Sequence, residues 1–225
     1  SPIGRLLSWL AGKVGWSEPT GEVLSVALIQ GAVPQELKWQ PSMLGPTLEL
    51  YGELTAPYLD HDLVIWPEAA IPAHYHQVTD YMDRLQDLAR DNGLHLVTGI
   101  PVKDQDSGSY YNGVVMLGER ASFYYKRHLV PFGEYLPLDF LHRDVVDYLN
   151  IPMSSFSAGE RSSPVLEAGG VRIGVSICYE DTFGDEVIEA LPEAAILVNV
   201  SNDAWFGDSI APHQHVQIAR MRSAE

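Results

Sequence analysis

From residue 23 onward, segments typical of buried strands alternate with segments typical of amphipathic helices, which limits the chain to an α/β architecture. The expected strands are rich in Val, Ile and Leu, and the expected helices turn apolar residues toward one face. The predicted strands are residues 23–30, 63–66, 95–101, 110–117, 121–125, 165–166, 171–177 and 196–200. The predicted helices are residues 46–58, 79–90 and 185–191, with a last helix from His213.

Local signals define some of the boundaries. Thr79 is expected to cap its helix, and Asn92-Gly93 to end it. Residues 118–120 are expected to form a hairpin turn between the strands on either side. Residues 126–161, which contain several Pro and Gly, are expected to be irregular apart from one short helix near Val145.

The composition is that of a globular domain and restricts its partners. Apolar residues make up 46% of the 225 residues and charged residues 20%, which is enough to build a core. The formal net charge of −16 opposes binding to nucleic acid or to anionic lipid, so any membrane association would be hydrophobic or covalent. No apolar run approaches the ~20 residues of a membrane-spanning helix. The single cysteine precludes an internal disulfide.

Residues 1–21 differ from the rest of the chain. Their apolar residues are spaced as in a helix around Arg5 and Lys13, and the segment ends in Glu18-Pro-Thr-Gly21. We expect either a terminal arm packed on the domain or a juxtamembrane segment with interfacial tryptophans. The rest of the chain, residues 22–225, is expected to form one domain.

Cys178 directly follows the apolar, β-branched strand at residues 171–177. Ligands and chemistry collect at the carboxyl ends of strands in α/β proteins, so this thiol is a candidate nucleophile. The alternative is a small buried side chain, which is the commoner role of a lone cysteine.

Two charged residues follow other predicted strands. Glu68 lies between Pro67 and Pro72 among apolar neighbours, a setting that suits a general acid or base, although a turn or helix-start carboxylate is the commoner case. Lys126 follows an aromatic strand, where an ammonium group could activate a thiol or stabilise an oxyanion. Its alternative is a surface lysine, like the neighbouring Arg127.

Together, these residues outline acyl transfer by covalent catalysis. Cys178 would attack a carbonyl group to form an acyl-enzyme, and Lys126 with the backbone N–H that follows Cys178 would stabilise the oxyanion. This set differs from the Cys–His pair of papain-like proteases, because it combines a cysteine with a glutamate and a lysine and needs no histidine.

The same residues carry a resemblance. Trp66-Pro-Glu68, Lys126 and Ile177-Cys-Tyr-Glu180 resemble, in order and spacing, the Glu–Lys–Cys triad of the nitrilase, or carbon–nitrogen hydrolase, superfamily over residues 23–225. Leu37-Lys-Trp39, the Val-Pro-Phe-Gly-Glu-Tyr-Leu-Pro of 130–137 and the Ser-Asn-Asp-Ala-Trp-Phe-Gly of 201–207 are similar to one family within it, the apolipoprotein N-acyltransferases. Soluble amidases more often continue into Arg-Phe-Pro, which the Asp-Thr-Phe-Gly of 181–184 does not reproduce.

This resemblance implies an α/β fold, a nitrilase-like α-β-β-α sandwich with two face-to-face sheets and outer helices. Cys178 would take a fatty acyl chain from a phospholipid as a thioester and pass it to the free amine of a diacylglyceryl-cysteine lipoprotein, without a cofactor or a metal. Glu68 would be the general base, Lys126 would stabilise the oxyanion, and Glu134 would support Lys126.

The resemblance also implies substrate contacts. Tyr179 and Glu180 would shape the pocket, and Trp39 would contact the acyl chain or the lipoprotein from a mobile loop. Trp205 would form a pocket wall, which is compatible with its other interpretation as the aromatic plug of a turn.

The implied setting is a monomer in the bacterial inner membrane with its catalytic domain facing the periplasm. The family places transmembrane helices before this domain and further strands after it, and neither is found in the 225 residues. We therefore expect residues 1–21 to be the end of that connection and the domain to lack its C-terminal strands.

Two other functions remain open at this point. One is a soluble amidase that hydrolyses a small amide with the same triad. The other is a catalytically silent module that binds lipid or lipoprotein. The pairs His74/His76 and His213/His215 are spaced like metal ligands, but they lack neighbouring cysteines or clustered carboxylates, so no metal site is predicted.

Overall fold

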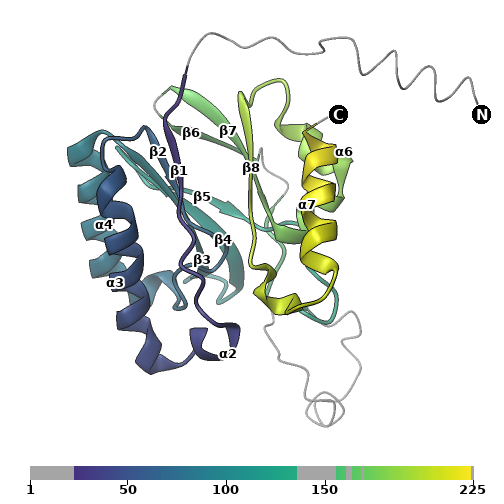
Figure 1. Ribbon diagram of the computed structural model, residues 1–225, viewed down its shortest axis with the longest axis horizontal. Coiled ribbons are helices and arrows are strands. Elements are labelled where there is room, and N and C mark those ends of the chain that lie inside the picture. The colour runs from purple at the N-terminus through teal and green to yellow at the C-terminus, as the bar shows by residue number, and fades with distance from the viewer. Residues whose placement is uncertain (1–22, 136–155, 161–163, 169, 224–225) are drawn as a thin grey trace, which may run out of the picture.

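The computed structural model describes residues 23–135, 156–160, 164–168 and 170–223, and it has the layered α/β arrangement that the sequence predicts (Figure 1). The expectations for residues 1–21 and for a helix near Val145 lie outside the described residues. Within the described part, no helix is long and apolar enough to cross a membrane.

The strands form two sheets, with strand orders β1-β2-β3-β4-β5 and β6-β7-β8. In the first sheet β1, β2 and β3 are parallel and β3, β4 and β5 antiparallel, and in the second β7 is parallel to β8 and antiparallel to β6. The strands are β1 (Val26–Leu28), β2 (Leu63–Ile65), β3 (His95–Lys103), β4 (Tyr110–Leu117), β5 (Ser122–Tyr125), β6 (Val165–Ala168), β7 (Val171–Ile177) and β8 (Ile196–Val200).

The helices lie on the outer faces of the two sheets (Figure 1). α3 and α4 cover the first sheet, and α6 and α7 cover the second. The helices are α2 (Gln35–Lys38), α3 (Leu44–Thr55), α4 (Thr79–Asn92), α6 (Gly184–Val187) and α7 (Ala211–Arg222). The 3-10 turns are η1 (Pro41–Met43), η2 (Ala56–Tyr58), η3 (Tyr75–Gln77), η4 (Cys178–Thr182), η5 (Ile188–Ala190) and η6 (Asp203–Phe206).

The core has two apolar layers. Between the sheets, residues such as Ile65 and Val114 pack with Ile173 and Ile177. On the outer side of the first sheet, residues of α3 and α4 pack around the fully buried Trp66. This order of helices, sheet, sheet and helices confirms the predicted α-β-β-α sandwich.

Several local predictions are confirmed and others are wrong. Gly93 has a left-handed φ of 69° and ends α4, and β4 and β5 form the predicted hairpin. Thr79, however, is the first residue of α4 and not its cap, because η3 runs straight into the helix and the Val78 carbonyl accepts its first hydrogen bonds. The helix predicted at 185–191 is a single α turn followed by η5, and Pro192 prevents its extension.

Candidate active site

Glu68 follows β2 and lies where the two sheets meet. Gly99 of β3 passes so close that a Cβ there would lie 2.6 Å from the Glu68 Cα and 2.5 Å from the Ala69 backbone nitrogen. The Glu68 carboxylate accepts hydrogen bonds from Asn112 Nδ2 at 2.8 Å and from the Asn202 backbone N–H at 2.9 Å. Because Asn112 belongs to β4 and Asn202 follows β8, groups from both sheets fix this carboxylate.

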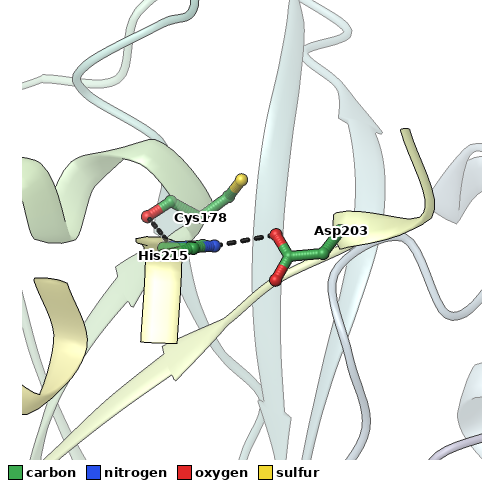
Figure 2. Close-up of side chains that lie close together, drawn as sticks. All are labelled: Cys178, Asp203 and His215. Carbon is green, nitrogen blue, oxygen red and sulfur yellow. Dashed lines mark hydrogen bonds and ion pairs between the residues drawn. The ribbon is translucent and has the colours of Figure 1, made fainter. Parts of the chain in front are cut away.

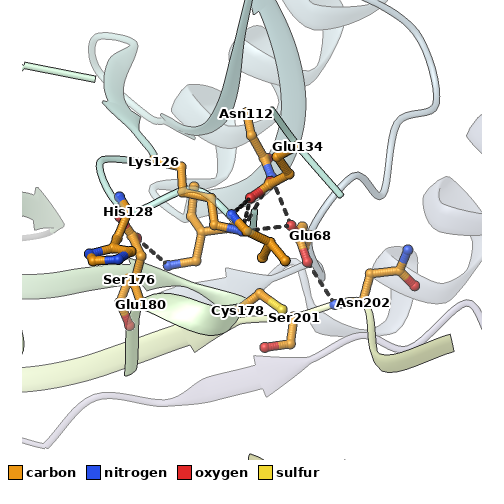
Figure 3. Close-up of polar contacts among 12 residues, drawn as sticks. Glu68, Asn112, Lys126, His128, Glu134, Ser176, Cys178, Glu180, Ser201 and Asn202 are labelled. Atoms are coloured by element: carbon orange, nitrogen blue, oxygen red, sulfur yellow. Dashed lines mark hydrogen bonds and ion pairs between the residues drawn. The ribbon is translucent and has the colours of Figure 1, made fainter. Parts of the chain in front are cut away.

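Lys126 follows β5 and is 1% exposed. Its Nζ lies 2.9 Å from Glu134 Oε2 and 3.8 Å from Glu68 Oε1 (Figure 3). Burial acts to lower the pKa of Lys126, but the charges of Glu68, Glu134 and Cys178 outweigh it, so the net effect raises this pKa. Lys126 therefore remains a cation at neutral pH.

Glu134 supports Lys126 and is itself held in place. One carboxylate oxygen accepts from Asn112 Nδ2 at 2.7 Å and from Lys126 Nζ at 3.0 Å, and the other accepts from the Val130 backbone N–H at 2.8 Å. The Asn112 amide thus bridges Glu134 and Glu68 and separates their negative charges.

Cys178 begins η4 immediately after β7 and has a left-handed φ of 50°. A non-glycine residue rarely adopts this conformation, and such strain is concentrated at functional turns. The thiol lies below the Glu68 and Lys126 side chains (Figure 3). Burial, reinforced by Glu68 and Asp203 and opposed by Lys126, raises the pKa of Cys178 to about 12. The resting thiol is therefore protonated, so attack requires a base.

Glu180 is buried, and several donors from the protein hold its carboxylate. Its carboxylate accepts hydrogen bonds from the backbone N–H groups of Ile177 at 2.7 Å and Arg127 at 2.6 Å, and from the Tyr124 hydroxyl at 2.9 Å. It joins the end of β7, before Cys178, to β5 and to the backbone directly after Lys126. Glu180 thus links the two chain segments that present Cys178 and Lys126, and its predicted part in shaping the pocket stays a prediction.

The two predicted tryptophans are exposed beside the site. Trp39 follows α2 and is 46% exposed, and Trp205 lies in η6 and is 57% exposed. The Asn202 side chain donates to Gln35 Oε1 at 3.0 Å and so joins the segments that carry the two rings. Tyr179 is half-buried, and its ring lies 5.1 Å from that of Phe183.

Several polar residues around the triad were not predicted from the sequence. Asn112 could have been noticed as an amide within an otherwise apolar strand. Lys38 is buried, its Nζ donates to the Glu68 carbonyl at 3.4 Å, and burial lowers its pKa to about 8 against the opposing effect of Glu68. Asp203 and His215 lie beside Cys178. Asp203 belongs to the 201–207 motif and His215 to the His213/His215 pair, but neither pattern predicted a contact with Cys178.

Cys178, Asp203 and His215 are the set of potential metal ligands that the described residues bring together, with donor atoms within 4.8 Å of one another (Figure 2). Both His215 nitrogens already face oxygen acceptors, so the geometry is that of a hydrogen-bonded imidazole. The His74 and His76 rings stack 5.6 Å apart and do not belong to this set.

A cavity of about 100 Å³ lies on the helix side of the second sheet, lined by residues that include Gly174, Glu180, Asp181, Ala190 and Arg222. Cys178 does not line it. Its volume is below the ~300 Å³ at which ligand pockets begin, so we do not assign substrate to it.

Comparison with known proteins identifies the family of this chain. Residues 25–225 match the model of the carbon–nitrogen hydrolase family, and the chain belongs to that family. More particularly, it is 48% identical over 214 residues to the apolipoprotein N-acyltransferase of Methylococcus capsulatus, covering 95% of this chain and 42% of the relative. It is 42% identical over 223 residues to that of Nitrosomonas europaea, covering 96% and 45%. The chain thus spans less than half the length of these relatives.

A solved structure supports the fold independently. Nit3 of Saccharomyces cerevisiae, a member of branch 10 of the nitrilase superfamily, matches with a TM-score of 0.62 at 21% identity, covering 92% of this chain and 73% of its own. The predicted nitrilase-like fold and the resemblance to apolipoprotein N-acyltransferases are both confirmed.

Proposed function

We propose that the protein transfers a fatty acyl chain from a phospholipid to the N-terminal amine of a diacylglyceryl-cysteine lipoprotein through a thioester on Cys178. The observation that carries this proposal is the convergence of Glu68, Lys126 and Cys178, in a chain whose relatives are named apolipoprotein N-acyltransferases.

The first half-reaction forms the thioester. Glu68 takes the thiol proton as the Cys178 sulfur attacks the ester carbonyl, and the oxyanion of the tetrahedral intermediate faces the Lys126 ammonium and the Tyr179 backbone N–H. The Tyr179 backbone N–H acts to lower the pKa of the Cys178 thiol, which supports this assignment. The ester C–O bond then breaks, and Glu68 returns the proton to the departing lysophospholipid alkoxide.

The second half-reaction forms an amide. Glu68 removes a proton from the attacking amine, the new C–N bond forms, and the C–S bond breaks. The proton held by Glu68 returns to the sulfur, which restores the neutral thiol. Because one acyl-enzyme serves two substrates in turn, we expect ping-pong kinetics.

The setting that we propose is the bacterial inner membrane, with this domain on the periplasmic side of a monomeric enzyme. The exposed rings of Trp39 and Trp205 support contact with acyl chain or lipoprotein, because aromatic side chains favour the boundary between apolar and aqueous surroundings.

Intact mass of the full-length protein tests the proposal. After incubation with a diacyl phospholipid, we expect the wild type to gain the mass of one fatty acyl group that hydroxylamine removes, and Cys178→Ala to gain none. Absence of this adduct, together with Cys178-dependent hydrolysis of small amides, would favour the soluble amidase. Absence of both activities in folded protein would favour the binding module.

A further inference from the structure

His215 of α7 lies beneath the turn that presents Cys178, and both ring nitrogens face oxygen atoms (Figure 2). Nδ1 lies 2.7 Å from Asp203 Oδ1, and Nε2 lies 3.3 Å from Asp181 Oδ1 and 3.3 Å from the Cys178 carbonyl oxygen. One imidazole therefore joins the last helix to η4 and η6, the two turns that border the nucleophile.

The buried carboxylate of Asp181 needs the His215 imidazole as a counter-charge. The Asp181 side chain is 2% exposed, and neither carboxylate oxygen accepts a hydrogen bond from the described residues. A buried carboxylate without a counter-charge is strongly destabilising, and the His215 ring is its ion-pair partner. Because an acceptor faces each nitrogen, the ring is best satisfied with protons on both, as a cation. The interaction with Asp181 is the main cause that raises the pKa of His215 to about 9.

The strained backbone conformation of Cys178 is held in part by its contact with His215. Its φ of 50° is strained for a residue with a Cβ, so the surrounding structure must hold it. The Cys178 carbonyl accepts a hydrogen bond from Asn199 Nδ2 at 3.0 Å and faces His215 Nε2. Asn199 anchors the turn from β8, and His215 anchors it from α7.

We propose that His215 is a positioning residue for acylation: its imidazolium pairs with Asp181 and Asp203 and fixes the strained turn that carries the nucleophile. This inference rests on the proposed role of Cys178. The charged groups near the thiol are Glu68 after β2, Lys126 after β5, Asp203 in η6 and His215 in α7, and Asp181 in η4 faces His215. Loss of the imidazolium leaves two carboxylates without its positive charge and so opposes both the thiolate and the oxyanion.

The test uses the full-length wild type, His215→Gln, Asp203→Asn and the double variant, with His213→Gln on the same helix as the control. One readout is the rate of thiol alkylation by iodoacetamide between about pH 6 and pH 9, and the other is acyl-enzyme formation in a single turnover. We expect His215→Gln to slow alkylation about tenfold at each pH, which corresponds to a shift of about one pH unit, and to slow acylation at least as much. Asp203→Asn should accelerate alkylation and should restore part of the rate in the double variant. His213→Gln should match the wild type.

Two results would overturn the inference. One is alkylation and acylation by His215→Gln within about twofold of wild type. The other is a lowered melting temperature of His215→Gln with an unshifted alkylation profile, since that is the signature of a purely structural contact. If His215→Gln does not fold, Asp203→Asn tests the inference by itself. An unchanged alkylation rate in Asp203→Asn would contradict the claim that the charges around His215 control the reactivity of the thiol. Alkylation requires no phospholipid, so it tests this inference separately from the proposed function. If the wild type forms no thioester but His215→Gln still slows alkylation, the proposed function fails and the effect of His215 on the thiol stands.

Discussion

The Cys178 thiol is surrounded by groups that keep its proton in place. Burial and the charges of Glu68 and Asp203 raise its pKa to about 12, and Lys126 compensates only in part. We expect the rate of alkylation of the wild type to rise about tenfold per pH unit through pH 9, whereas an ordinary thiol levels off near a pKa of ~8.5. Measurement with iodoacetamide checks this, and a plateau below pH 9 would contradict it.

Glu68 should affect chemistry and alkylation in opposite directions. In Glu68→Gln the amide cannot accept the thiol proton, so acyl-enzyme formation should fall by about 10²- to 10⁴-fold. The same change removes a negative charge near the thiol, so alkylation should become faster. Single-turnover mass measurements and iodoacetamide kinetics give the two rates. A parallel loss of both would instead indicate a damaged site.

At the residue scale, the sequence predicted the side chains at strand ends and missed those that depend on pairing across the fold. Glu68, Lys126 and Cys178 each follow a recognisable strand, and the structure brings them together. Asn112 lies in mid-strand, and His215 reaches Cys178 from a helix at a sequence distance of 37 residues, so periodicity gave no signal for either.

Among the elements, β5 and β7 end together because one buried carboxylate receives donors from both. Glu180→Gln would place an amide N–H₂ against backbone N–H groups, and buried hydrogen bonds to a charged group contribute about 1.5–3 kcal/mol. We expect the free energy of unfolding to fall by about 2 kcal/mol or more and acylation to slow as Lys126 and Cys178 move apart. Denaturant unfolding measures this, with the exposed Glu167→Gln of β6 as the control. Equal stability of the two variants would contradict the positioning role.

The approach of β3 to the Glu68 segment is equally sensitive. A methyl group at Gly99 would lie 2.5 Å from the Ala69 backbone nitrogen, so Gly99→Ala must displace the segment that carries Glu68. We expect overpacking to cost about 1–3 kcal/mol of stability and acylation to fall by at least tenfold. Gly52→Ala in α3, where a Cβ meets nothing within 4 Å, should leave acylation unchanged. Unimpaired acylation by Gly99→Ala would show that the contact is not needed.

The elements themselves were largely predictable because core-facing periodicity is local. β4 is bounded as predicted, and Gly93 ends α4 because a left-handed residue is needed there. The errors occur next to 3-10 turns. Val78, between η3 and α4, takes the cap position expected at Thr79, and the helix predicted at 185–191 tightens into a 3-10 turn before Pro192.

On the scale of the whole molecule, the exposed tryptophans should affect substrate capture and not the nucleophile. Trp39→Ala and Trp205→Ala should each raise the KM for phospholipid by up to about tenfold, because one aromatic contact contributes about 0.5–1.5 kcal/mol beyond the area that it buries. The rate of Cys178 alkylation should stay at the wild-type value. Ile188→Ala, 59% exposed on η5, is the control. Wild-type KM values in both tryptophan variants would exclude them from the lipid site.

The Glu68 carboxylate is held by one donor from each sheet, Asn112 from β4 and the Asn202 backbone after β8. Neither half of the sandwich alone can hold the base in this position, and formation of the acyl-enzyme requires the base. A chain whose two sheets have not docked therefore lacks an oriented base, and Cys178 cannot take up an acyl group and pass it to an amine while the protein is still folding. Catalytic competence should appear only with the final docking step, later than the recovery of secondary structure.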